Sequence, residues 1–294
     1  MLRRLCWVLS LGVVVCGLSG SAFADFGTPS WWQDVQFGGS GIVGSNSQLV
    51  YDEISVGGET VRLALMAHGR YAYSQTVDID TQTYYVETGK YGGTGGDKDY
   101  AKWNFGFYVA AGSVSQFLGV KLFYDFDPGK DSSPLNEAWF MANFSRIPDT
   151  TGDKGDPDTL DGEAEDSWNL AMNFLSQNIP AIADLNQDGK IDGNSENFPF
   201  GSKSGVYVFG VSVPSGPPGF NPNVMGEYTF KLEVFRVNPK VENGQIVDFQ
   251  WAPEPLGGIE MRVNAVPEPA TLVGLASLGA SGLGAVVLRR RKKA

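Results

Sequence analysis

Apolar and polar residues alternate with a period of two along much of the chain. The clearest runs are residues 61–67, 103–109, 118–124, 168–174, 207–213, 228–234 and 259–263. Each run has one apolar face and one mixed face, which is typical of strands half buried in an antiparallel sheet.

Residues that favour turns separate these runs. Pairs such as Gly57–Gly58 and Gly257–Gly258 lie between them, and Asn243–Gly244 is the strongest tight-hairpin signal. Many strands with frequent turns predict a mostly β fold, an antiparallel β-sandwich that is jelly-roll-like. One helix is expected over residues 137–147. Residues 149–166 carry eight carboxylates and one lysine, and are expected to form a long exposed acidic loop.

The first 24 residues have the pattern of a secretory signal peptide. Arg3 and Arg4 precede an apolar stretch, and Ala22-Phe23-Ala24 is a small-x-small cleavage site, so signal peptidase is expected to leave Asp25 as the first residue. A lipoprotein signal at Cys16 is the alternative, but Val15 stands where a small residue is wanted. Residues 25–265 are then one extracytoplasmic β-sandwich domain.

Composition excludes several classes of chemistry for this domain. Both cysteines, Cys6 and Cys16, lie in the signal, so the domain has no disulfide, thiol nucleophile or thiolate metal site. Of the 22 Lys and Arg residues, 15 lie between residues 25 and 265, against 32 of the 33 acidic residues. The resulting formal charge of −17 disfavours nucleic acid as a partner and suits divalent cations or simple solubility.

One stretch, DLNQDGKIDGNSENF, has the spacing of a calcium-binding loop and resembles the loops of dockerin modules. Oxygen ligands are expected from Asp184, Asn186, Asp188, Asp192, the backbone carbonyl of Lys190 and Glu196, with Gly189 at the sharp turn. The twelfth position, which should supply a bidentate carboxylate, is Ser195, and Glu196 comes one residue late. The alternative is a turn in which Asp and Asn side chains bind their own backbone. The same choice between a cation site and a turn applies to Asp125, Asp127 and Asp131.

No catalytic constellation is evident, so the protein is not expected to be an enzyme. The single histidine, His68, is expected at the surface end of a strand, and no nucleophile-elbow motif accompanies it. Paired carboxylates for glycoside hydrolysis stay open as a third function. Exposed aromatic residues would instead favour a carbohydrate-binding module. The candidates are Trp31, Trp32, Tyr71, Tyr73, Tyr84 and Tyr85.

The last 29 residues hold a second membrane-directed segment. Residues 270–288 are 19 uncharged residues, about 28 Å of helix, which is just enough to span a hydrocarbon core. Five basic residues, Arg289, Arg290, Arg291, Lys292 and Lys293, follow this span and predict that the domain faces outward. Four glycines in the span make it a poor structural helix and favour a processing signal.

The triplet Pro267-Glu268-Pro269, flanked by Val266 and Ala270, the apolar span and the basic cluster together resemble the PEP-CTERM sorting signal of exported proteins in Gram-negative bacteria. The resemblance covers residues 266–294. It implies recognition near the triplet by exosortase, a membrane protease, after transient anchoring in the inner membrane. The expected function is therefore a structural or adhesive component of the cell surface or exopolysaccharide matrix, with Ca²⁺ as a stabilising ion.

Overall fold

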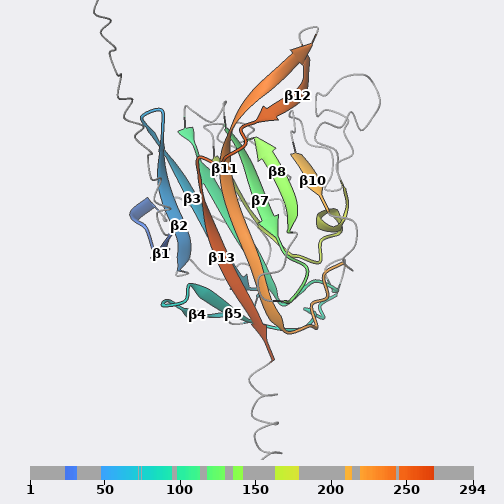
Figure 1. The fold of residues 1–294 in the computed structure, drawn as a ribbon. Coiled ribbons are helices and arrows are strands. Elements are labelled where there is room, and N and C mark those ends of the chain that lie inside the picture. Colours follow the sequence, from blue (N-terminus) through green and yellow to red (C-terminus); the bar gives the residue numbers. More distant parts are fainter. Residues whose placement is uncertain are drawn as a thin grey trace, which may run out of the picture.

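The computed structural model describes residues 24–31, 48–71, 73, 75–94, 98–112, 118–129, 135–141, 163–178, 209–213, 219–242 and 245–267. These residues form two β-sheets that pack face to face (Figure 1). The five-stranded sheet has the order β1-β2-β3-β6-β9, and its neighbouring strands are antiparallel. Its strands are β1 (Asp25–Gly27), β2 (Leu49–Val56), β3 (Glu59–Gly69), β6 (Trp103–Ala110) and β9 (Glu163–Trp168).

The eight-stranded sheet has the order β10-β8-β7-β11-β13-β5-β4, and β12 pairs with the far half of β11. Its strands are β4 (Gln75–Asp78), β5 (Thr83–Glu87), β7 (Leu118–Tyr124), β8 (Asn136–Met141), β10 (Phe209–Ser212), β11 (Gly226–Glu242), β12 (Gln245–Trp251) and β13 (Gly257–Val266). The pair β13–β5 is parallel, whereas the other pairs in this sheet are antiparallel.

Aromatic side chains fill the space between the sheets. The ring centroids of Phe105 in β6 and Phe230 in β11 are 4.6 Å apart, and Phe107 lies 5.6 Å from Phe140 in β8. Trp103 contacts Tyr228 at 5.7 Å. Each such pair adds roughly 0.5–1.5 kcal/mol beyond its area burial, so this layer accounts for much of the cohesion between the sheets.

The outer face of the five-stranded sheet is also buried at its centre. Ala64 and Met66 of β3 and Tyr108 of β6 alternate with the inward residues, yet each is at most 2% exposed. Trp31, which follows β1, stacks on Tyr108 at 5.6 Å and covers part of this face. The alternating pattern predicted half-buried strands, and that prediction is wrong for β6, which is buried on both faces.

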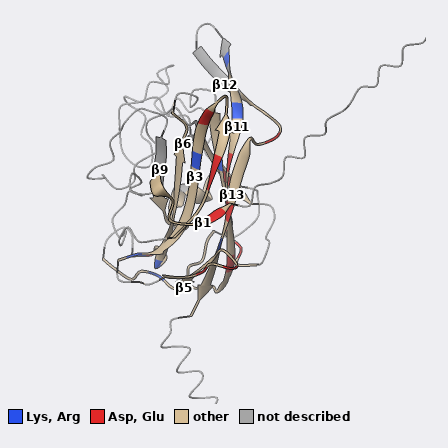
Figure 2. Ribbon diagram, turned by 90° about the vertical axis from the view of Figure 1, so that its left-hand side faces the viewer, with Lys and Arg blue, Asp and Glu red and all other residues tan. Residues whose placement is uncertain are grey.

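The outer face of the eight-stranded sheet carries charged pairs instead. Lys121 lies 2.9 Å from Glu137, and Lys231 lies 3.2 Å from Glu260 of the neighbouring strand. Figure 2 colours the Lys and Arg positions and the Asp and Glu positions along the strands of both sheets. This face therefore has the polar surface expected of an antiparallel sheet in contact with water.

Most of the strand predictions are confirmed. Residues 61–67, 103–109, 118–124, 228–234 and 259–263 lie within β3, β6, β7, β11 and β13, and β10 covers residues 209–212 of the expected 207–213. The expected hairpin joins β11 to β12, with Glu242 paired to Gln245.

Three further predictions, about where elements lie, are wrong. The helix expected from Glu137 begins instead as strand β8, because Ala138 and Phe140 point inward as alternate residues and β7 offers a paired edge. The strand expected over residues 168–174 does not form, because β9 ends at Trp168 and a short 3-10 helix, Asn173–Ser176, follows. The last four residues of the expected acidic loop, 163–166, belong instead to β9, which pairs with β6, and residues 149–162 lie outside the described part.

Candidate functional site at the tail end of the sandwich

Strand β13 carries the chain directly out of the folded domain. It lies between β11 and β5, and the carbonyl of its last residue, Val266, accepts a hydrogen bond of 2.9 Å from the Thr88 amide. Pro267 follows and has no amide hydrogen with which to extend the ladder. The last described strand therefore ends immediately before the Pro-Glu-Pro triplet, and we call this end of the sandwich the tail end (Figure 1).

Backbone hydrogen bonds join the loops at the tail end side by side. The Gly89 amide donates to the Pro222 carbonyl at 2.7 Å, and the Lys102 amide donates to the Gly89 carbonyl at 3.1 Å. The Arg70 amide in turn donates to the Lys102 carbonyl at 2.8 Å. The loops after β3 and β5 and the loop before β11 are thus fixed next to Val266.

Four tyrosines, Tyr71, Tyr73, Tyr91 and Tyr100, form the tyrosine cluster of the tail end. The buried Arg70 guanidinium lies 5.2–5.4 Å from the ring centroids of Tyr71, Tyr91 and Tyr100, which is cation–π distance. Tyr71 also stacks on Tyr91 at 4.7 Å, with a backbone φ of 51° that non-glycine residues seldom adopt. The cluster holds Tyr71 at the surface, 38% exposed.

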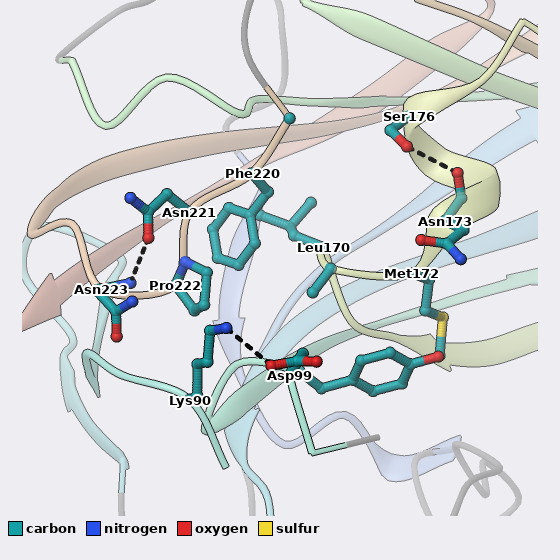
Figure 3. A pocket seen from close by; sticks show the side chains of 13 residues that line it. Lys90, Asp99, Leu170, Met172, Asn173, Ser176, Phe220, Asn221, Pro222 and Asn223 are labelled. Carbon is teal, nitrogen blue, oxygen red and sulfur yellow. Dashed lines mark hydrogen bonds and ion pairs between the residues drawn. The ribbon is translucent and has the colours of Figure 1, made fainter. Parts of the chain in front are cut away.

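A groove of about 570 Å³ opens beside the cluster (Figure 3). Leu170, Met172 and Phe220 supply apolar walls, and Lys90 pairs with Asp99 at 2.8 Å. That ion pair lowers the pKa of the Asp99 carboxyl through the hydrogen bond and the positive charge of Lys90. The remaining lining residues are Tyr100, Ala171, Asn173, Ser176, Gly219, Asn221, Pro222 and Asn223.

The groove combines amide side chains with aromatic and apolar surface. The Asn221 side chain accepts a hydrogen bond of 3.1 Å from the backbone amide of Asn223, and this bond shapes the loop. The exposed side chains of Asn173 and Asn223 place their amide groups at the groove. Tyr100 belongs to both the groove and the tyrosine cluster. The arrangement can bind a polar ligand that has hydrogen-bonding groups and an apolar face.

His68 is not at the surface, contrary to the prediction, but is 1% exposed. Its register with Asn104 of β6 places it on the outer face of the five-stranded sheet, where Nε2 lies 2.8 Å from the Ser167 hydroxyl. Burial, together with a smaller contribution from the nearby Arg70 charge, lowers the pKa of His68 to about 4. The ring is therefore neutral at pH 7.

Asn169 connects this buried polar network to the tail end. Its side chain accepts hydrogen bonds from the Ala101 and Ala171 amides, and its amide nitrogen donates to Asn104 at 2.7 Å and to the Trp103 carbonyl at 2.7 Å. These bonds draw the chain out of strand geometry after Trp168, which explains why the expected strand stops there.

The aromatic residues proposed from the sequence as sugar contacts separate into different environments. Trp31 and Tyr84 are buried, and the Tyr84 hydroxyl donates to the Gln48 carbonyl, so both are core residues. Tyr71 and Tyr73 join the tyrosine cluster, and Tyr73 donates to the Tyr91 carbonyl. Tyr85 is half-buried in β5, and Trp32 lies outside the described residues. Tyr91 and Tyr100 were missed because their loop has no regular period.

The acidic turn after β7 uses its carboxylates for its own backbone. Asp125 accepts a hydrogen bond of 2.7 Å from the Asp127 amide, and Asp127 accepts one of 3.0 Å from the Gly129 amide. Within the described ranges no group of three or more His, Cys, Asp or Glu side chains is placed to hold a metal ion. The expected calcium loop lies outside those ranges, so its residues Asp184, Asn186, Asp188, Lys190, Asp192 and Glu196 stay a prediction.

The expected sorting residues are described only as far as Pro267. Residues 268–294, which include Glu268, Pro269, Ala270, Arg289, Arg290 and Arg291, lie outside the described part. In the part that is described, no helix is long and apolar enough to cross a membrane.

The chain thus combines a folded β domain with a C-terminal segment that follows directly on its last strand. Residues 265–292 match the PEP-CTERM protein-sorting motif. This motif indicates an exported protein that is sorted by exosortase and processed at the membrane. No curated protein and no solved structure matched the chain significantly.

A second Pro-Glu-Pro triplet, Pro253-Glu254-Pro255, lies in the exposed turn between β12 and β13. Strand β13 follows it, whereas an uncharged span follows Pro269. The sorting motif matches only the terminal triplet, Pro267-Glu268-Pro269. The chain therefore contains its own control for recognition of the triplet alone.

Proposed function

We propose that this protein is exported, held briefly in the inner membrane by residues 270–288, and processed by exosortase near Pro267-Glu268-Pro269. Signal peptidase removes residues 1–24 beforehand. The released domain then serves as a structural or adhesive component of the cell surface or exopolysaccharide matrix. The observation that carries this proposal is the sorting motif at residues 265–292, which begins at the end of the last strand.

The structure of the junction supports processing without loss of the fold. Strand β13 is paired on both sides up to Ala265, and Val266 still accepts a hydrogen bond from Thr88. A cut beyond Val266 removes no strand pair and none of the aromatic core. The released product is therefore expected to keep its stability.

A structural role agrees with the surface and the core. The domain has charged pairs on the outer face of the larger sheet and an aromatic core between the sheets. The acidic surface and the expected Ca²⁺ site at residues 184–196 suit the millimolar calcium found outside cells. Together these features describe a domain that stays folded in the matrix without disulfides.

Replacing the terminal triplet tests the proposal directly. The variant P267A/E268A/P269A should accumulate as an unprocessed, membrane-associated precursor in the native host, as measured by fractionation and immunoblotting. The matched control P253A/E254A/P255A removes the internal triplet from an exposed turn and should be processed like the wild type. Equal processing of all three proteins contradicts sorting through the terminal triplet.

Carbohydrate binding is the second candidate function, and the groove favours it. Asn173 and Asn223 offer amides, and Tyr100 and Phe220 offer rings, which is the combination that sugars require. A glycan array probed with the released domain and with N223A tests this idea, and a glycan bound equally by both proteins contradicts the groove as its site. Glycoside hydrolysis gains no support here, because Asp99 is the one carboxylate among the described lining residues and it pairs with Lys90.

A further inference from the structure

The sorting tail leaves very little chain between the folded domain and the membrane. Val266 ends β13, and the uncharged span begins at Ala270, four residues later. Fully extended, four residues reach at most about 14 Å. The headgroup layer alone is roughly 5–7 Å deep on each side of a bilayer. While the tail is anchored as proposed above, the tail end of the sandwich must therefore lie close to the lipid surface.

The tail end exposes large apolar side chains beside the exit of the tail. Val224 is 37% exposed and Met225 is 57% exposed, and they immediately precede β11. The first residue of β11, Gly226, pairs with Ala265, so Met225 lies at the level of Val266. Among the described residues, Tyr71, Val224 and Met225 are three of the five large hydrophobic residues that are exposed.

The tyrosine cluster gives the same end a second feature that suits a membrane interface. Tyrosine is enriched at headgroup depth because its ring is apolar and its hydroxyl is polar. The backbone hydrogen bonds from Arg70 through Lys102 and Gly89 to Pro222 connect the cluster to the loop that carries Val224. A domain with a formal charge of −17 gains little from attraction to anionic lipids, so uncharged contacts suit it better.

We propose that the tail end is a membrane-contact surface of the anchored precursor. Met225 and Val224 enter the headgroup layer of the bilayer, and Tyr71 lies at its edge. The contact holds the sandwich in one orientation, which presents the Pro-Glu-Pro triplet at the lipid surface. Cleavage of the tail removes the tether, and a contact of so few side chains does not hold the domain on the membrane afterwards.

Site-specific fluorescence on the anchored precursor, Asp25 to Ala294, tests the contact, because the chain beyond its signal has no cysteine. M225C and L256C variants of this precursor each receive one environment-sensitive NBD label. Leu256 is a matched control, since it is 37% exposed but lies in the turn before the start of β13, away from the tail end. Both proteins are placed in nanodiscs of phosphatidylethanolamine and phosphatidylglycerol, with and without headgroup spin-labelled lipid.

We expect the spin-labelled lipid to quench the label at position 225 at least about twofold, because a side chain inserted into the headgroup layer lies beside the spin label, and to leave position 256 unchanged. Severing the tail should abolish the quenching at position 225. Equal quenching at the two positions, or none at position 225, overturns the contact. Quenching that needs added exosortase shows a protein partner and also overturns it.

Failure of the proposed anchoring gives a separate result. In that case the precursor from Asp25 to Ala294 does not co-elute with nanodiscs, and the membrane contact is refuted together with the anchor. Co-elution without quenching at position 225 refutes the contact alone and leaves the sorting proposal standing.

Discussion

The buried imidazole of His68 should make the stability of the folded domain fall in mild acid. Its pKa is about 4 in the folded protein, against 6.5 in the unfolded chain, because burial disfavours the charged form. The unfolded chain therefore takes up the proton first as the pH falls. The contribution of the neutral His68 ring to the free energy of unfolding is fully present above pH 6.5. It is lost progressively as the pH falls from 6.5 through 4.

The magnitude follows from the difference between the two pKa values. A tenfold change in proton affinity is worth about 1.4 kcal/mol, so the full effect is about 3 kcal/mol below pH 4. At pH 5 the loss is about 2 kcal/mol, because the unfolded histidine is then almost fully charged and the folded one is mostly neutral. That loss is a large fraction of the net stability of an ordinary domain.

Urea unfolding of the processed protein and of H68Q, at pH 7.5 and pH 5, measures the effect. The wild type should lose about 2 kcal/mol more between these two pH values than H68Q does, since both share every carboxylate. Because His68 is the only histidine, its imidazole NMR signals also report directly and should not titrate above pH 5. Equal losses in the two proteins, or a ring that titrates near pH 6.5, would refute the account of His68.

Other substitutions test the remaining parts of the structure. N169A should lower the free energy of unfolding by about 3 kcal/mol, because it leaves buried amides and carbonyls without partners. N173A, on the exposed 3-10 helix, should change it by less than about 0.5 kcal/mol. Similar denaturant midpoints for the two variants would contradict this prediction. G226A should lower the free energy of unfolding by at least about 2 kcal/mol, since the φ of Gly226 is 149° and a β-carbon there would collide with the Pro128 carbonyl. An unchanged denaturant midpoint would show that the backbone at Gly226 is not constrained in this way. D188A should abolish a calcium-dependent rise in Tm, and calorimetry that finds no calcium binding in the wild type would exclude the calcium loop.

The fold was predictable where each strand contributes its own pattern. The alternation of residues 228–234 and 259–263 is local, and it correctly indicated the interiors of β11 and β13. The segment from Glu137 was not recoverable, because its inward residues, Ala138 and Phe140, are as compatible with a helix as with a strand. Pairing with β7 decides the outcome, and pairing depends on residues distant in sequence.

The candidate site was less predictable, because it depends on contacts between distant segments. His68 and Ser167 are 99 residues apart, and nothing in their local sequence indicates that they meet. The groove brings together Lys90, Leu170 and Phe220 from three different loops. The sorting motif is the opposite case, because its recognition depends on contiguous residues, and it was identified from the sequence and confirmed by the match at residues 265–292.

The central claim is that the protein is sorted and cut at its tail. Intact-mass spectrometry of the protein purified from its native host measures both ends of the mature chain. We expect a chain that begins at Asp25 and ends near the Pro267-Glu268-Pro269 triplet, with the span and the basic cluster removed. A mature chain that still ends at Ala294 would contradict the account.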